Sequence, residues 1–146
     1  MKHFQLLFLI AIVALFAGCE KPDSEQPLPT FPVTYSTIDG AWELTEWNGQ
    51  HLMEGTYLYI EFDSREHRFE MWDNLGSMYA QNRTGYFNIA QNSYEQYILS
   101  GYYDYGIGDW ANEYVVSMSV YGKKMSWITD AETMIFSHID SIPELN

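Results

Sequence analysis

The chain has 146 residues, the length of one small domain, and it carries twelve Tyr, eight Phe and five Trp against seven Lys and Arg. This aromatic content favours β-structure, because large rings fit a pleated and half-buried surface. A formal net charge of -13 argues against nucleic-acid binding and against electrostatic attachment to anionic lipid, both of which need clustered Lys and Arg.

Residues 1–18 have the pattern of a signal peptide: Lys2 precedes an apolar run over 4–16 that is short for a membrane-spanning helix. Cys19, the only cysteine, follows directly. The stretch Leu15-Phe16-Ala17-Gly18-Cys19 resembles a bacterial lipobox, with Phe16 where that motif usually has Leu. The resemblance implies cleavage before Cys19 and its acylation, which would hold the protein on a membrane. The alternatives are an ordinary signal peptide and an uncleaved anchor.

Residues 19–37 are predicted to form a tether. Four prolines between 22 and 32, with acidic residues among them, disfavour packing into a sheet interior. Acidic residues after a lipidated cysteine also resemble the surface-export signals of Bacteroidetes lipoproteins, and a solvated spacer is the other interpretation. We therefore expect an outer-membrane lipoprotein of the cell envelope, with the periplasmic or surface face left open.

Residues 38–146 are predicted to form one β-barrel domain. In the first strand, over 38–49, Trp42, Leu44 and Glu46 fall on one face at period two. Alternating runs recur over 56–63, 67–72, 84–89, 95–102, 113–120, 124–129 and 133–139. Short links and the lack of helical segments predict an all-β, up-and-down antiparallel barrel of about eight strands, whose closure removes exposed edges.

Connection lengths predict two different ends of the barrel. Successive loops of a meander alternate between ends, and the long loops at 48–55, 73–82 and 103–112 all fall at one of them. We expect an open mouth there and a tight base at the other end. The tether enters at the base, so the mouth is predicted to face away from the membrane.

Gly40-Ala41-Trp42 resembles the Gly-x-Trp signature of lipocalins. Longer phrases, Trp42–Gly49, Tyr59–Phe62, Ser100–Gly106 and Ile142-Pro143, resemble the lipocalin-like domains of Bacteroidetes lipoproteins. The resemblance implies a lipocalin-like barrel and an envelope location. In lipocalins the signature Trp packs across the base, commonly against an Arg of the last strand. Here His138 stands in that place, and we expect it to stack on Trp42.

Aromatic residues at the mouth carry the main functional prediction. Trp72, Tyr79, Tyr103, Tyr105 and Trp110 lie in or beside the long loops. Such rings stack against a small molecule, a sugar or a peptide segment. The alternative is that they plug the mouth of a filled barrel. Glu46, turned inward near the mouth, would orient a polar group of the ligand, unless it is a solvated strand end.

Other chemistry has weaker support. Asp73, Asn74, Asp104 and Asp109 offer oxygen donors for calcium on loops, but their spacing matches no EF-hand and such residues also form turns. No metal or cofactor is predicted. Once Cys19 is lipidated, His51, His67 and His138 are the main candidates for a base, and no Gly-x-Ser-x-Gly motif occurs. We therefore predict that the protein is not an enzyme.

Two functions remain. The first is a membrane-anchored lipoprotein that binds a small hydrophobic or glycan ligand at the barrel mouth. The second is a structural subunit with a filled barrel that presents its aromatic loops to an envelope protein or a glycan. A binder needs an internal cavity of roughly a few hundred Å³, whereas a subunit would have a filled interior and an exposed aromatic patch on the outside.

Overall fold

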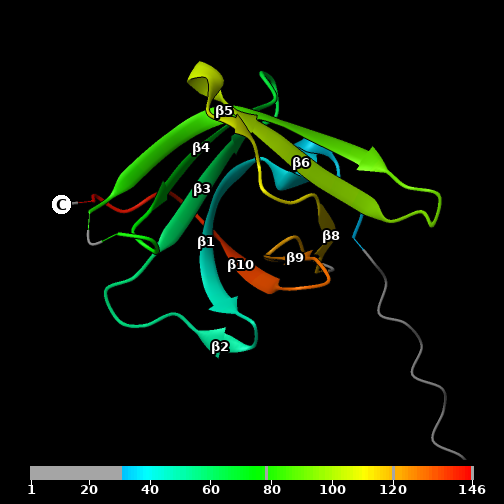
Figure 1. Cartoon of the computed structure of the whole chain (residues 1–146). Coiled ribbons are helices and arrows are strands. Elements are labelled where there is room, and N and C mark those ends of the chain that lie inside the picture. The colour runs from blue at the N-terminus through cyan, green and yellow to red at the C-terminus, as the bar shows by residue number, and fades with distance from the viewer. Residues whose placement is uncertain (1–30, 78, 120, 146) are drawn as a thin grey trace, which may run out of the picture.

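The computed structural model describes residues 31–77, 79–119 and 121–145, which form a closed barrel of eight antiparallel strands (Figure 1). These are β1 (Gly40–Trp47), β3 (Leu58–Asp63), β4 (Arg68–Asp73), β5 (Gln81–Gln91), β6 (Tyr97–Tyr103), β8 (Tyr114–Met118), β9 (Lys124–Ile128) and β10 (Thr133–Ile139). Two-residue strands β2 (Gln50–His51) and β7 (Gly108–Asp109) pair with β1 and β6. The predicted all-β, up-and-down barrel of the lipocalin-like type is confirmed.

Each barrel strand pairs with the next one along the chain, and β10 closes the barrel against β1. The junction between β6 and β8 is short, with three residue pairs from Tyr97–Val116 to Leu99–Tyr114. Loops 48–57, 74–80, 104–113 and 129–132 share one end of the barrel, which we call the mouth. The first three of them are long, whereas 129–132 is as short as the turns that share the base.

Alternation along the strands fills the lower part of the barrel with apolar side chains. Leu44 pairs with Phe136 across the closing seam, and both are buried together with Ile60 and Leu99. Removing these side chains from water supplies the main stabilisation of the fold, at about 25 cal/mol per Å² of apolar surface. The strand faces predicted to form the core are buried at Leu58, Ile60, Phe62, Phe69, Met71 and Phe87, while Ile89 is half-buried.

The segment before β1 packs on the base of the barrel. Phe31 forms a bridge with Met118, Val33 is 2% exposed, and the one-turn helix α2 (Tyr35–Ile38) begins with a Thr34 cap. The tether prediction is wrong over residues 31–37, because apolar side chains there find a buried surface. Residues 19–30, Cys19 and the signal peptide lie outside the described residues.

Tyr35 of α2 fixes this segment across the base. Its ring stacks on His67 with centroids 3.8 Å apart, and its hydroxyl donates to Asn88 Oδ1. None of the described helices is long and apolar enough to cross a membrane.

Trp42 lies in the filled lower part of the barrel with no exposed surface. Its Nε1–H donates to the carbonyl of Ile38 at 2.8 Å, and its ring meets that of His138 edge to face, with centroids 5.1 Å apart. Gly40 has φ +97°, and a Cβ there would come within 3.2 Å of the His138 ring. The glycine of the Gly-x-Trp signature is therefore required by backbone geometry and by this contact.

Candidate functional site at the barrel mouth

A pocket of about 300 Å³ opens inside the barrel at the mouth, above the filled lower part. Its wall is largely aromatic and apolar, with Leu58, Met71 and Met134 facing the same space. The aromatic rings are those of Trp47, Tyr103, Trp110, Tyr114 and Trp127. This volume is at the lower end of the range of ligand pockets and suits one small molecule.

An ion pair lies at this mouth pocket because the inward faces of β4 and β5 end in opposite charges. In β4 the buried positions Phe69 and Met71 are followed by Asp73, which is 4% exposed. In β5 Arg83 pairs in register with Met71, and its Nη2 donates to Asp73 Oδ2. The guanidinium also lies 5.7 Å from the ring centroid of Tyr103.

Two glycines at inward positions make room for aromatic rings. A Cβ on Gly85 would clash with the carbonyl oxygen of Tyr102 and would also lie 2.8 Å from the ring of Phe69, and one on Gly101 would collide with the ring of Trp110. Trp110 enters at the short β6–β8 junction, where its backbone N–H donates to the Gly101 carbonyl at 2.8 Å. Its indole lines the mouth pocket and also a groove on the outer surface, so it forms part of the barrel wall.

Three buried N–H groups on residues that line the mouth pocket have no acceptor among the described residues. They are Arg83 Nε, Trp110 Nε1 and Trp127 Nε1. Trp110 is 8% exposed and Trp127 is 3% exposed, and their rings stack with centroids 5.3 Å apart. The two indole rings therefore form one buried layer of the barrel wall.

A second polar group lies on the opposite side of the mouth pocket. The Tyr114 hydroxyl and the Asn112 side-chain amide both donate to Glu132 Oε1, each at 3.2 Å. Burial raises the pKa of Tyr114, with a further contribution from the neighbouring Glu132 carboxylate. Tyr114 is therefore a neutral hydroxyl at physiological pH.

The expectation that Glu46 points into the barrel is wrong, because a β-bulge interrupts β1. Leu44 pairs with the buried Phe136, but the register then shifts, and Glu46 pairs with Ile135 while Trp47 pairs with the buried Met134. Directly paired residues share a face of the sheet. The extra residue therefore turns Trp47 into the mouth pocket and Glu46 to the outer surface.

The five aromatic residues predicted for ligand binding do not form one cluster. Tyr103 and Trp110 line the mouth pocket. Trp72 pairs with Tyr59 on the outer wall, where it is half-buried. Tyr79 is 80% exposed and Tyr105 is 96% exposed on the mouth loops.

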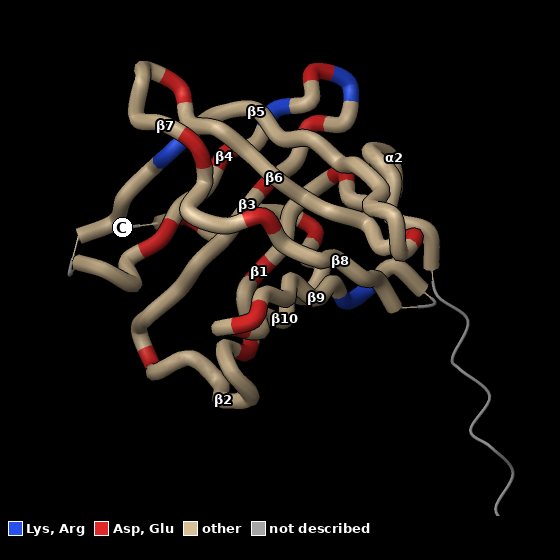
Figure 2. Tube along the Cα trace, turned by 45° about the vertical axis from the view of Figure 1, so that its right-hand side comes forward, with Lys and Arg blue, Asp and Glu red and all other residues tan. Residues whose placement is uncertain are grey.

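Three of the four residues considered for calcium are engaged separately, and the fourth, Asp109, is exposed in β7. Asp73 binds Arg83, the Asn74 side chain binds the backbone of residues 55 and 57, and Asp104 binds Arg68 and Thr84. Acidic residues recur all round the barrel (Figure 2), but within the described residues no three His, Cys, Asp or Glu side chains form a metal-binding group. The predicted oxygen donors therefore do not converge on a cation site.

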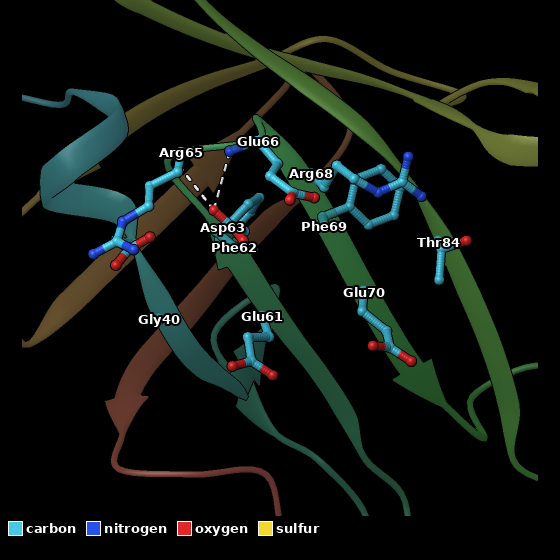
Figure 3. A pocket seen from close by; sticks show the side chains of 11 residues that line it. Gly40, Glu61, Phe62, Asp63, Arg65, Glu66, Arg68, Phe69, Glu70 and Thr84 are labelled. Atoms are coloured by element: carbon cyan, nitrogen blue, oxygen red, sulfur yellow. Dashed lines mark hydrogen bonds between the residues drawn. The ribbon is translucent and has the colours of Figure 1, made fainter.

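A larger groove of about 480 Å³ runs along the outer wall beside β3 and β4 (Figure 3). The carboxylates of Glu61 and Glu70 project from adjacent strands, and Asp63 accepts hydrogen bonds from the backbone N–H groups of Arg65 and Glu66. Those bonds lower the pKa of Asp63. These side chains stabilise a turn and a solvated surface, so the mouth pocket is the better candidate site.

Five residues of the mouth pocket were not predicted from the sequence, namely Trp47, Arg83, Tyr114, Trp127 and Glu132. The predicted strand over 84–89 begins three residues late, and extending its alternation backward from Phe87 through Gly85 places Arg83 inward. That alternation was the available signal for Arg83. Comparison of the chain with family models, with curated proteins and with solved structures gave no match.

Proposed function

We propose that the protein binds a small, largely apolar molecule in the mouth pocket and carries out no catalysis. The observation that supports this most is the contrast between a filled lower barrel and an open, aromatic-lined space of about 300 Å³ above it. A purely structural barrel has no need to leave this space open. Flat molecules of one or two rings, or short apolar chains, match the volume of this space and the aromatic and apolar side chains that line it.

The same proposal includes a lipid anchor at Cys19 and a place in the cell envelope, as in the lipocalin-like lipoproteins that the sequence resembles. Its support is the lipobox-like stretch around Cys19 together with the place where residues 31–33 pack on the barrel. Phe31 and Val33 pack at the base, so an anchor preceding them leaves the barrel from the end opposite the mouth. The mouth pocket would then face away from the membrane.

A second candidate is an interaction subunit that contacts an envelope protein or a glycan through the mouth loops. It is favoured by exposed apolar side chains on three of these loops, at Met53, Tyr79, Tyr105 and Ile107, which are 65–96% exposed. Exposed apolar groups of this kind mark interaction surfaces when they are contiguous. In the first candidate the ligand contacts the interior of the pocket, whereas in the second the partner contacts the tips of the loops.

Binding of N-phenyl-1-naphthylamine, an uncharged dye that fluoresces in apolar sites, tests the first candidate. We expect saturable binding of one dye per chain. Ala111→Phe adds a ring at an exposed position that lines the pocket and should weaken binding at least tenfold. Ala90→Phe, an identical change at an exposed position near the base end of β5, is the matched control and should leave affinity unchanged.

Absence of saturable binding, or equal affinity in the two alanine variants, would contradict the proposal. Loss of capture of an envelope partner on replacing Tyr105 and Tyr79 with Ser, in a protein that binds no dye, would establish the second candidate instead.

A further inference from the structure

We infer that the ligand of the mouth pocket is a small aromatic or apolar amine, which binds as an ammonium ion and pairs with the carboxylate of Glu132. This inference rests on the proposed function and specifies the polar end of its ligand. The apolar and aromatic wall of the pocket receives the rest of the molecule.

The position of Glu132 carries the first step. This residue comes directly before β10, in which the alternate residues Met134 and Phe136 are buried inside the barrel. Continuing the alternation backward places Glu132 on the inner side of the wall, and it lines the mouth pocket together with Met134. Glu132 is half-buried there, as expected of a residue at the opening of a pocket.

The hydrogen bonds of Glu132 carry the second step, because they hold its carboxylate without neutralising it. The Tyr114 hydroxyl and the Asn112 amide, both from the pocket wall, donate to Oε1 at 3.2 Å, and neither donor is charged. The second oxygen, Oε2, accepts no hydrogen bond from the described residues. It is not one of their fully buried atoms without a partner, so it stays accessible to a ligand.

The balance of charges at the pocket carries the third step, the choice of a cation. Two carboxylates, Asp73 and Glu132, and one guanidinium, that of Arg83, line the pocket. Arg83 is paired with Asp73, and no Lys, Arg or His nitrogen of the described residues lies within 4.0 Å of the Glu132 carboxylate. The pocket therefore keeps a negative charge, in a chain whose formal charge is -13. An ammonium ion is complementary to this charge, whereas a carboxylate ligand would be repelled.

The aromatic wall of the pocket favours the same ligand. Its rings attract a cation that approaches their faces. The pocket already contains one such pair, since the guanidinium of Arg83 lies 5.7 Å from the ring centroid of Tyr103. An amine can therefore gain from the wall as well as from Glu132.

Three naphthalenes of similar shape test the inference by calorimetric titration of the full chain. They are 2-(2-naphthyl)ethylamine, which is a cation at neutral pH, 2-(2-naphthyl)ethanol, which is uncharged, and 3-(2-naphthyl)propanoate, which is an anion. We expect the amine to bind about tenfold more tightly than the alcohol, the effect of one charge-assisted hydrogen bond, and the carboxylate to bind most weakly. This ranking needs no variant and so does not depend on a mutant that folds.

Glu132→Gln removes the charge but keeps an oxygen that can accept from Tyr114 and Asn112. It should weaken binding of the amine about tenfold and leave binding of the alcohol unchanged. Glu113→Gln is the matched control, because it removes one negative charge at an exposed position that lines the outer groove beside Trp110 and not the mouth pocket. It should change neither affinity at physiological salt, which screens exposed charges.

Equal affinities of the amine and the alcohol would overturn the inference but leave the proposed function standing, since the pocket would still bind. Tightest binding of the carboxylate would overturn it as well. So would an equal loss of amine binding in the two glutamine variants, because the overall charge of the chain would then attract the amine. If the uncharged dye binds and none of the naphthalenes does, the inference alone is wrong. If the dye also fails, the proposed function itself is wrong.

Discussion

Two buried tryptophans show how the base and the mouth of this barrel differ. Trp42 in the lower barrel has no exposed surface, donates its N–H to Ile38 and meets His138 edge to face. Trp127 at the mouth is 3% exposed, yet no described residue accepts its N–H. The lower barrel is packed with buried apolar side chains, whereas a pocket of about 300 Å³ opens at the mouth.

The backbone at the base also differs from the backbone at the mouth. The base is closed by short turns and by helix α2, whose Thr34 cap binds the backbone N–H of Thr37. The mouth is built from three long loops and a bulge in β1, and β8 pairs with β6 over Tyr97–Leu99, in the half of β6 nearer the base. Bulges and long loops commonly accompany binding sites because they re-aim single side chains.

Truncating Trp42 is the change expected to have the largest effect on stability. Trp42→Ala should lower the free energy of unfolding by about 3–5 kcal/mol, because it leaves a cavity in a filled core and an unpaired Ile38 carbonyl. Chemical denaturation measures this loss. Trp72→Ala on the half-buried outer wall is the control, with an expected loss of about 1 kcal/mol. Similar losses in both variants would contradict the distinction between a filled lower barrel and its surface.

Breaking the ion pair at the mouth should have an intermediate effect. Arg83→Met leaves the buried carboxylate of Asp73 without its partner and should lower the free energy of unfolding by about 2 kcal/mol, since Arg83 itself is partly exposed. The double variant with Asp73→Asn removes the unpaired charge and should recover part of the loss. A double variant less stable than Arg83→Met would show that Asp73 is stabilised by something other than Arg83.

The fold was predictable because the strands alternate apolar and polar residues with few exceptions, and period two sets both strand and face. The places where this alternation is interrupted determine which side chains line the mouth pocket. The extra residue between Leu44 and Glu46 makes the later side chains of β1 point to the opposite face of the sheet. No residue type in that stretch predicts a bulge. The helix α2 was hidden within a proline-rich segment, whose composition predicts a tether although Val33 and Ile38 are buried.

The aromatic residues of the long loops predicted only part of the mouth pocket. Tyr103 and Trp110 line the pocket, but Tyr105, two residues away, is 96% exposed. Adjacent loop residues take different directions that composition does not reveal. The inward Asp73 and Arg83 follow from strand alternation once the start of β5 is known, and that boundary depends on pairing with β4.

The smallest expected effect concerns Asp104, in the 3-10 turn η1 (Asp104–Gly106) of the mouth loop that contains Trp110. Its carboxylate accepts hydrogen bonds from the Thr84 hydroxyl and the Arg68 guanidinium, and these lower its pKa. A carboxyl group whose pKa is lower in the folded state stabilises the fold above its ordinary pKa of about 3.9. That contribution is lost as the pH falls toward and through the lowered folded-state value.

Asp104→Asn should therefore lower the thermal midpoint slightly at pH 7, because the group is near the surface and well screened. The difference between wild type and variant should stay constant down to about pH 5 and shrink below pH 4, as the wild-type carboxyl becomes protonated. Asp109→Asn, which removes an exposed carboxylate from the same loop, controls for the loss of one negative charge. A difference that grows as the pH falls would mean that Asp104 is repelled by its surroundings rather than held by Thr84 and Arg68. In that case the hydrogen bonds of Asp104 would not stabilise the loop that contains Trp110, and packing of Trp110 in the barrel wall would be what holds this loop.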